Sequence, residues 1–337
     1  MIKKSFLFIL FTFLIDYSIS SGFVQEQNCS APLAAHLFDS IGFKIKKISF
    51  RNNQNSNCII KKYPQEYEKE HLINPSINNR RLILSSLMLI SFNYAAYQPF
   101  KHAWWEEERT YFHLYRGWRQ SKGYWDFGWN DTLYGHIDKL GHYFSARLLS
   151  EQIYYISRWI GFNENSSKLI GPILSSLLML QIEIYDGHFK EWGFSIADFT
   201  ANELGAFAPL IAEKISFLKN FQLKFSYHPS NLPKQEATFI KDYAGMTFWF
   251  SCNVHSLLPV TIKKYYPPWL NFALGYSVSK PTRGKIELYL APDINWMKVP
   301  IGNIQTMTFI KKTLNYFHFP CFSLKLLPDE KFYSIYF

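Results

Sequence analysis

The chain has 337 residues, of which 48% are hydrophobic and 19% aromatic, and this excludes a disordered or low-complexity protein. Its mean hydropathy of −0.13 argues against a protein built mostly of membrane-spanning helices. The formal net charge is +10, but the basic residues stand in short, dispersed blocks, so nucleic-acid binding is not predicted and an anionic membrane or lipid surface is the favoured partner.

Residues 1–20 have the layout of a secretory signal peptide. Two lysines open the segment, an apolar run from Phe6 to Ile15 follows, and Ser18 and Ser20 supply small residues before a plausible cleavage point. The run is shorter than the roughly 20 residues of a full span, although an uncleaved anchor is the alternative. The chain is therefore expected in the cell envelope, in the periplasm or at the outer membrane.

Residues 21–81 form a polar, basic segment that contains two of the four cysteines. The four are Cys29, Cys58, Cys252 and Cys321. In an exported protein they either form disulfides, with three possible connectivities, or stay free. The chain has no Cys-x-x-Cys spacing, which argues against thiolate zinc sites. No small apolar residues precede Cys29, so lipid attachment is not predicted there.

Residues 82–218 predict a helical domain. Helices are expected at 82–97, 137–160, 169–186 and 196–215. The first is expected to stop before Pro99, and Pro209 to kink the last. Their apolar runs are short for spans of about 20 residues, so these membrane-type helices are expected to be buried in protein or to lie in the interface.

Residues 97–136 hold 13 aromatic residues, including half of the tryptophans, interleaved with charged residues. Such a mixture suits the interface of a bilayer. A packed core with a solvent-exposed edge explains the same composition, so both interpretations stay open.

Residues 219–337 predict an antiparallel β region of about six strands. Apolar and other residues alternate with period two, most clearly at 221–227, 270–278 and 286–290. The fold class is therefore α+β, a helical bundle followed by this β region. The final residues, KFYSIYF, resemble the closing strand of an outer-membrane barrel, which makes such a barrel the alternative. Against it, a closed barrel needs at least about 8 strands.

The last three predicted helices each carry a polar pair at helical spacing. The candidate catalytic residues are Asp138, His142, Glu183, Asp186, Asp198 and Asn202. Residues three or four apart share one helix face, so packing of the helices brings the pairs together. The cluster would suit a divalent metal through oxygen and nitrogen ligands. It would equally suit acid–base chemistry, with His142 taking a proton and a carboxylate orienting it.

A purely structural explanation of the same residues stands beside these. Ser195 and Asp198 fit a capping box, and the other polar groups would lock helices together as an inter-helix network. Lys139 is expected to pair with one of the acids or to point away, because an isolated buried ammonium is costly. Glu191 and His188 are expected at the rim of the cluster.

Three segments resemble an uncharacterised envelope family of YfiM type, described as predicted periplasmic lipoproteins. They are IDKLGHYFSARLLS (137–150), QIEIYDGHFKEWGFSIADFTANELGA (181–206) and KDYAGMTFWFSCNVHSLLP (241–259). The similarity runs in order over roughly residues 82–337. A looser similarity extends to VanZ-like membrane proteins, which show the same order of polar motifs. The positions carried over are Asp138, Lys139, His142, Glu183, Asp198 and Asn202.

Two departures from the family pattern concern His188, where a smaller apolar or aromatic residue is common, and the missing lipid-attachment cysteine. The resemblance implies an envelope location and a shared helical motif, but brings no established activity. The sequence thus predicts an exported, membrane-associated envelope protein of unknown activity, with a candidate polar site. A non-catalytic envelope scaffold is the opposing interpretation, and whether the protein is an enzyme stays open.

Overall fold

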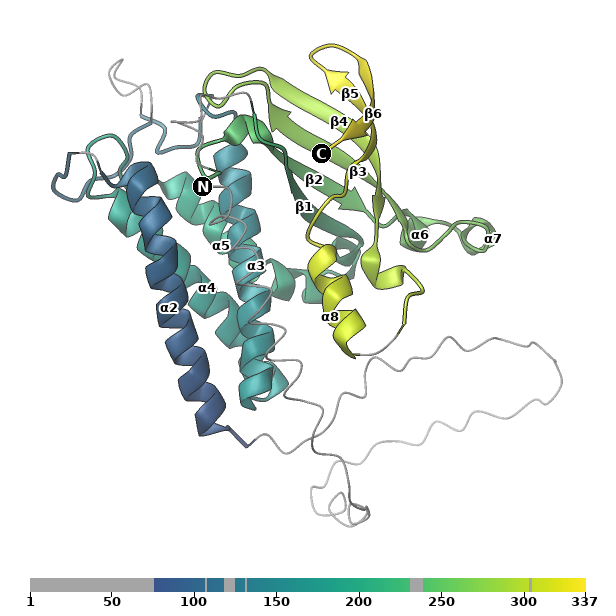
Figure 1. Cartoon of the computed structure of the whole chain (residues 1–337), viewed down its shortest axis with the longest axis horizontal. Helices are drawn as coiled ribbons and strands as arrows, with labels where there is room; N and C mark the ends of the chain where they lie inside the picture. The colour runs from purple at the N-terminus through teal and green to yellow at the C-terminus, as the bar shows by residue number, and fades with distance from the viewer. Residues whose placement is uncertain (1–75, 107, 118–124, 131, 231–238, 303–304) are drawn as a thin grey trace, which may run out of the picture.

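The computed structural model describes residues 76–106, 108–117, 125–130, 132–230, 239–302 and 305–337. The predicted signal peptide, most of the polar segment that follows it, Cys29 and Cys58 lie outside the described residues. The described chain forms a helical layer followed by a sheet, as the α+β prediction states (Figure 1).

Four long helices make the helical layer. They are α2 (Asn79–Trp104), α3 (Ile137–Ile160), α4 (Glu164–Asp186) and α5 (Ile196–Lys214). Three of them begin at a side-chain cap, since Asn78, Asn163 and Ser195 each accept a hydrogen bond from a backbone N–H of the first turn. Helix α3 packs against both α4 and α5. Among the described helices, α4 has the length and composition of a membrane span, which a core helix can also have.

The prediction that the first helix stops before Pro99 is wrong, because α2 continues to Trp104. Proline removes one backbone hydrogen bond from the helix, but tertiary contacts hold the last turns in place. Trp105, just after the helix, lies 4.7 Å from Tyr185 of α4 and 5.5 Å from Tyr97, measured between ring centroids. Aromatic packing between helices therefore outweighs the local effect of the proline.

The sheet has six antiparallel strands in sequence order. They are β1 (Phe221–Tyr227), β2 (Met246–Cys252), β3 (Leu270–Val278), β4 (Ile286–Ile294), β5 (Cys321–Leu327) and β6 (Lys331–Tyr336). Short helices connect the main elements: η2 (Ser216–Asn220), η3 (Tyr243–Gly245), α6 (Val254–Leu257), α7 (Val260–Lys263), η4 (Trp296–Lys298) and α8 (Gln305–Leu314). Cys252 of β2 and Cys321 of β5 are free thiols.

The sheet is open, so the outer-membrane barrel considered from the last residues is wrong. Strands β1 and β6 are its two edges, and β6 holds the predicted closing strand. Six strands are fewer than the roughly 8 that the smallest membrane barrels use. The inner face of the sheet, defined here as the face that carries Trp249 and points away from α3, is covered by the segment after α8. There His318 stacks on Trp249 with ring centroids 3.8 Å apart.

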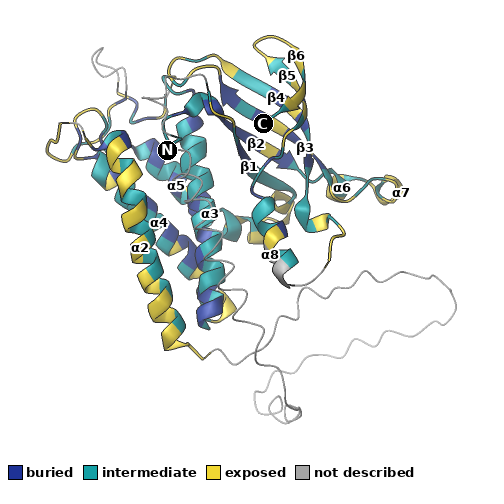
Figure 2. Cartoon of the chain, viewed as in Figure 1, coloured by how far each residue is buried: buried dark blue, intermediate teal, exposed yellow. Residues whose placement is uncertain are grey.

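The start of α3 joins the two layers. Ile137 is fully buried in one core cluster with Phe225 of β1, Phe248 of β2 and Val278 of β3. Figure 2 shows buried residues on α3 and on the strands of the sheet, whereas most of α2 is exposed or half-buried. The turn before α3 uses Gly135 with φ +59°, a conformation that favours glycine. This junction places the first two turns of α3 against the sheet.

The aromatic stretch from 97 to 136 divides into two parts. Trp105 is 6% exposed and belongs to the helical core, whereas Tyr111, Trp125 and Trp129 are 93%, 52% and 56% exposed. The backbone of residues 110–115 pairs with the link between α4 and α5, for example through Tyr115 N–H to the Phe194 carbonyl at 2.8 Å. Packed core and exposed surface thus both occur in this stretch.

Candidate functional site

Five of the six candidate residues meet at one point between α3, α4 and α5, around the imidazole of His142. Its Nδ1 lies 3.0 Å from Asn202 Oδ1 and 3.3 Å from Glu183 Oε1, and its Nε2 lies 3.6 Å from Asp138 Oδ1. The i, i+4 spacing of Asp138 and His142 on α3 puts both on one face of that helix. The imidazole is therefore surrounded by groups from all three helices.

Glu183 and Asn202 form the floor of the cluster. They are 1% and 0% exposed, and Asn202 Nδ2 donates a hydrogen bond to Glu183 Oε1 at 3.0 Å. Close packing of α5 on α3 makes this possible, because a Cβ at Gly205 would lie 2.2 Å from the Tyr143 carbonyl oxygen. A side chain at that glycine would push Asn202 away from His142.

Lys139 and two aspartates form the partly open side. Lys139 Nζ lies 2.7 Å from Asp198 Oδ1 and 3.2 Å from Asp138 Oδ2, so the lysine pairs with acids of the cluster. These side chains are 17%, 11% and 20% exposed. Tyr243, from η3, donates a hydrogen bond to Asp138 Oδ1 at 3.3 Å. Solvent or a small polar group can therefore approach from this side.

The charges around His142 shift the pKa values of the cluster. Burial alone lowers the pKa of His142, but Glu183, Asp198 and Asp138 outweigh it and raise the pKa to about 9. Burial raises the pKa of Glu183 to about 8, with the positive charge of His142 opposing the shift. Burial also disfavours ionised Asp138, but Lys139 and His142 hold its pKa below the ordinary value.

Asp186, the sixth candidate, points to a different partner. Trp105 Nε1 donates a hydrogen bond to its Oδ1 at 2.6 Å. Burial raises the pKa of Asp186 to about 7, while the hydrogen bond from Trp105 opposes that shift. The structure therefore places Asp186 beside the aromatic packing of α2 and α4, with no described hydrogen bond to the other five.

A cation could find ligands here, because the ligand atoms of Asp138, His142 and Asp198 all lie within 4.8 Å of one another. However, the ammonium of Lys139 already lies close to both aspartates. A divalent ion would have to displace this ammonium or share the carboxylates with it. The donor set thus fits a metal only with rearrangement, whereas it fits proton chemistry as it stands.

Asp198 takes part in both arrangements that its sequence position allows. Its backbone N–H donates to Ser195 Oγ at 3.2 Å, so Ser195 caps α5. Its carboxylate turns instead to Lys139. Capping therefore explains the position of Ser195, and the cluster explains the side chain of Asp198.

The expected rim position of His188 is wrong. His188 is exposed and lines an open groove on another face of α4 with Leu177, Gln181 and Ile184, and no residue of the cluster lines that groove. Glu191 is exposed in the link between α4 and α5.

Two contacts of the candidate residues were missed at the sequence level. Tyr243 contacts Asp138 from a turn 105 residues away, and Trp105 contacts Asp186 from 81 residues away. Neither residue stands at a spacing that indicates a shared site. Their positions depend on how the sheet and α2 pack on α3 and α4.

Residues 125–213 match a family described as predicted periplasmic lipoprotein, a domain of unknown function numbered 2279. The matched segment contains α3, α4 and α5, and with them the whole cluster around His142. The resemblance to the YfiM-type family is consistent with this match, which fits a protein of the cell envelope. The looser similarity to VanZ-like proteins is not shown. No curated protein and no solved structure matches the chain.

Proposed function

We propose that this chain is an exported, membrane-associated envelope protein in which the cluster around His142 is a general acid–base site. One observation carries the proposal: an imidazole is held between Asp138 and Glu183, in a cluster that is buried on one side and partly open on the other. Such surroundings keep a proton on the imidazole near neutral pH and allow it to reach an entering group.

Each neighbour then has a distinct role. Asn202 Oδ1 accepts the hydrogen bond of Nδ1–H and so fixes the ring orientation, which leaves Nε2, the nitrogen facing Asp138, as the working atom. Lys139 helps to keep Asp138 ionised and forms an ion pair with Asp198. A proton transferred from Nε2 to a substrate leaves neutral imidazole, which Asn202 Oδ1 holds in place through Nδ1–H until solvent returns a proton to Nε2.

The location of this site is part of the same proposal. The signal-peptide layout of residues 1–20 and the family description both support export. The basic charge and the exposed apolar side chains of the chain, among them Val260 at 84% and Tyr265 at 79%, support contact with a lipid surface. The proposal places the protein on the periplasmic side of a membrane.

Complementation of a deletion strain separates the site from a scaffold. His142→Gln and Asp138→Asn should abolish the rescued phenotype although the purified variants still fold and melt cooperatively above the growth temperature. His188→Gln, a matched change at an exposed histidine, should rescue fully. If loss of rescue instead follows loss of stability across these variants, the scaffold interpretation holds and the acid–base site is wrong.

A divalent-metal site is a second candidate, favoured by the ligand atoms of Asp138, His142 and Asp198 within 4.8 Å. Titration calorimetry with Zn²⁺ and Mn²⁺ tests it on the full chain. Metal function predicts saturable binding that Asp198→Asn weakens. Lys139→Met should strengthen the binding, because the variant has no ammonium group to compete for the carboxylates of Asp138 and Asp198. If neither the wild type nor Lys139→Met binds metal saturably, the metal site is wrong and the acid–base site is the remaining candidate.

A further inference from the structure

The sheet has its polar side chains inside and its apolar side chains outside. On the inner face, Lys224 Nζ and Asp293 Oδ2 form an ion pair of 2.8 Å, with side-chain exposures of 0% and 2%. Ser251 and Asn271 are also buried there and hydrogen-bond to each other. Antiparallel sheets of water-soluble proteins usually bury the apolar face and expose the polar one. Part of this outer face packs on α3, since Phe225, Phe248 and Val278 lie on it beside Ile137. The part that α3 does not cover is suited to a further apolar neighbour.

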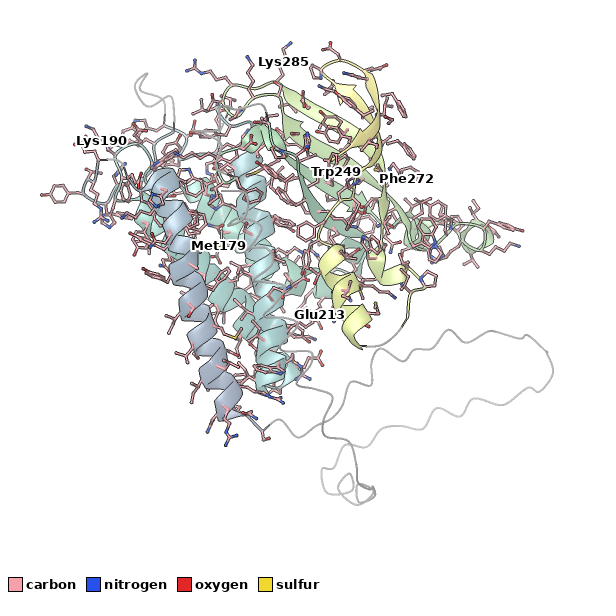
Figure 3. All side chains as sticks on the ribbon, viewed as in Figure 1. Met179, Lys190, Glu213, Trp249, Phe272 and Lys285 are labelled. Carbon is pink, nitrogen blue, oxygen red and sulfur yellow. The ribbon has the colours of Figure 1, made fainter. Side chains whose placement is uncertain are left out.

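One row of side chains crosses the whole sheet on this outer face. The paired positions in register are Leu223, Phe250, Leu274, Leu290, Leu324 and Phe332. The five from β2 to β6 are between 41% and 64% exposed. Phe272 continues the exposed face along β3, while Trp249, one position from Phe250, lies buried inside (Figure 3). An apolar band of this kind costs free energy in water.

The connection between β2 and β3 extends this band into a projecting tip, defined here as residues 254–269. Helices α6 and α7 carry it away from the end of the sheet, on the side opposite α2 (Figure 1). Val260 is 84% exposed, Tyr265 79% and Ile262 52%, higher than most apolar residues of the core elements. Aliphatic and aromatic side chains at a protruding loop are typical of segments that enter a membrane interface.

Positive charge accompanies these apolar side chains. Lys263 and Lys264 lie within the tip, and the ammonium of Lys264 stands 4.6 Å from the ring centroid of Tyr265. Burial lowers the pKa of His255, and the positive charges of Lys263 and of Lys298, from η4, lower it further. Lysines beside exposed apolar residues match a surface that offers both negative headgroups and hydrocarbon.

We infer that the tip, together with the adjoining outer face of the sheet at Phe250 and Phe272, is the surface by which the protein docks on a bilayer containing anionic phospholipid. The inference rests on the proposed membrane association and names its surface and its lipid class. Apolar side chains of the tip enter the acyl boundary, and Lys263 and Lys264 contact headgroup phosphates. Two copies joined tip to tip would bring four like charges together, which disfavours self-association as the use of this surface.

Vesicle co-sedimentation of the purified full chain tests this surface. The probes are vesicles of equimolar phosphatidylcholine and phosphatidylglycerol, and vesicles of phosphatidylcholine alone. Lys263→Glu/Lys264→Glu should lower the partition coefficient on anionic vesicles at least about tenfold, since each basic residue near the surface contributes about 1 kcal/mol. Val260→Asp/Tyr265→Ser should lower binding to both vesicles. The control Lys280→Glu/Lys285→Glu carries the same charge change at exposed positions beyond the other end of β3 and should bind nearly as the wild type.

The outcomes separate the two proposals. Suppose that the wild type binds anionic vesicles, and that both tip variants melt like the wild type and bind these vesicles equally well. The assignment of the docking surface to the tip is then wrong, while membrane association stands. If the wild type does not bind either vesicle, membrane association fails and the tip with it. A concentration-dependent dimer in sedimentation velocity that Val260→Asp/Tyr265→Ser abolishes would assign the surface to a second copy and overturn the inference.

Discussion

The helical layer and the sheet both bury charged side chains, but they balance the charges differently. In the sheet one ammonium, Lys224, faces one carboxylate, Asp293, and its remaining hydrogen bonds go to groups such as the Ile294 carbonyl at 2.7 Å. In the helical layer, Lys139 and His142 face three carboxylates on a side that is partly open. The pair in the sheet is closed and matched, whereas the cluster has acidic groups in excess.

Two histidines show the consequence of this difference. In the sheet region, burial lowers the pKa of His318 to about 4, with Asp293 opposing the shift, and the ring stacks on Trp249. In the helical layer, the carboxylates overcome burial and raise the pKa of His142 to about 9. A buried histidine beside a matched ion pair is neutral and structural. A buried histidine beside surplus carboxylates holds a proton that it can transfer.

The largest effect is expected from breaking the ion pair of the sheet. Lys224→Met leaves Asp293 buried and unpaired, which should lower the free energy of unfolding by about 3–5 kcal/mol. The double variant Lys224→Met/Asp293→Leu should recover much of that loss, because no charge is then left buried. Guanidinium unfolding measures both. A single variant as stable as the wild type would show that the pair contributes nothing to the sheet.

A smaller effect is expected where α5 meets α3. Gly205→Ala places a Cβ 2.2 Å from the Tyr143 carbonyl oxygen, so the helices must separate, at a cost of about 1–3 kcal/mol. Gly141→Ala is the matched control, because its Cβ would meet its nearest neighbour, Phe248, at an ordinary 3.8 Å. Urea unfolding of the two variants should differ in sign, since alanine favours helix. Equal destabilisation would contradict the close approach.

The pH dependence of stability should reveal the protons held by the cluster in the helical layer. The folded pKa values of His142 and Glu183, about 9 and about 8, lie above their ordinary values of 6.5 and 4.5. The folded protein then holds protons that the unfolded chain has released, so this contribution is fully present below the ordinary values and is lost as pH rises toward 9.

The melting temperature of the wild type should therefore fall between pH 6.5 and 9. The decline should be shallower in His142→Gln, while His188→Gln should follow the wild type. Differential scanning calorimetry across this range measures it. A decline of equal slope in His142→Gln would mean that other groups cause it.

The smallest effect is expected at the cap of α5. Ser195→Ala removes the acceptor for Asp198 N–H and should lower the free energy of unfolding by about 1 kcal/mol. The carboxylate of Asp198 should keep its contact with Lys139, so the pKa of His142 should not move. A change in that pKa would show that the cap also positions the cluster.

Much of the fold and of the cluster could be predicted from hydrophobic periodicity and from the spacing of polar residues. The predicted helix at 137–160 coincides with α3, and period-two alternation leads to the six strands. The i, i+4 pairs on α3 and α5 bring His142 and Asn202 together because each pair occupies one helix face.

The remaining features depend on contacts distant in sequence. Helix α2 passes through Pro99 because Tyr185 of α4 packs on Tyr97, before the proline, and on Trp105, just after the helix. Asp186 turns from the cluster because Trp105 offers an indole N–H. Alternation also indicates that strand faces differ, but not that the polar face is the inner one, since that depends on the pairing of Lys224 with Asp293 across the curved sheet.

Direct titration of His142 tests the acid–base site most directly. With ¹⁵N-labelled histidine, NMR chemical shifts followed from pH 4 to 10 report each ring separately, and the spectrum of His142→Gln assigns its signal. The cluster predicts an apparent pKa of about 9 for His142, well above that of His318, and a lower value in Glu183→Gln because one neighbouring carboxylate is gone. A His142 that titrates at or below 6.5 would contradict the acid–base site.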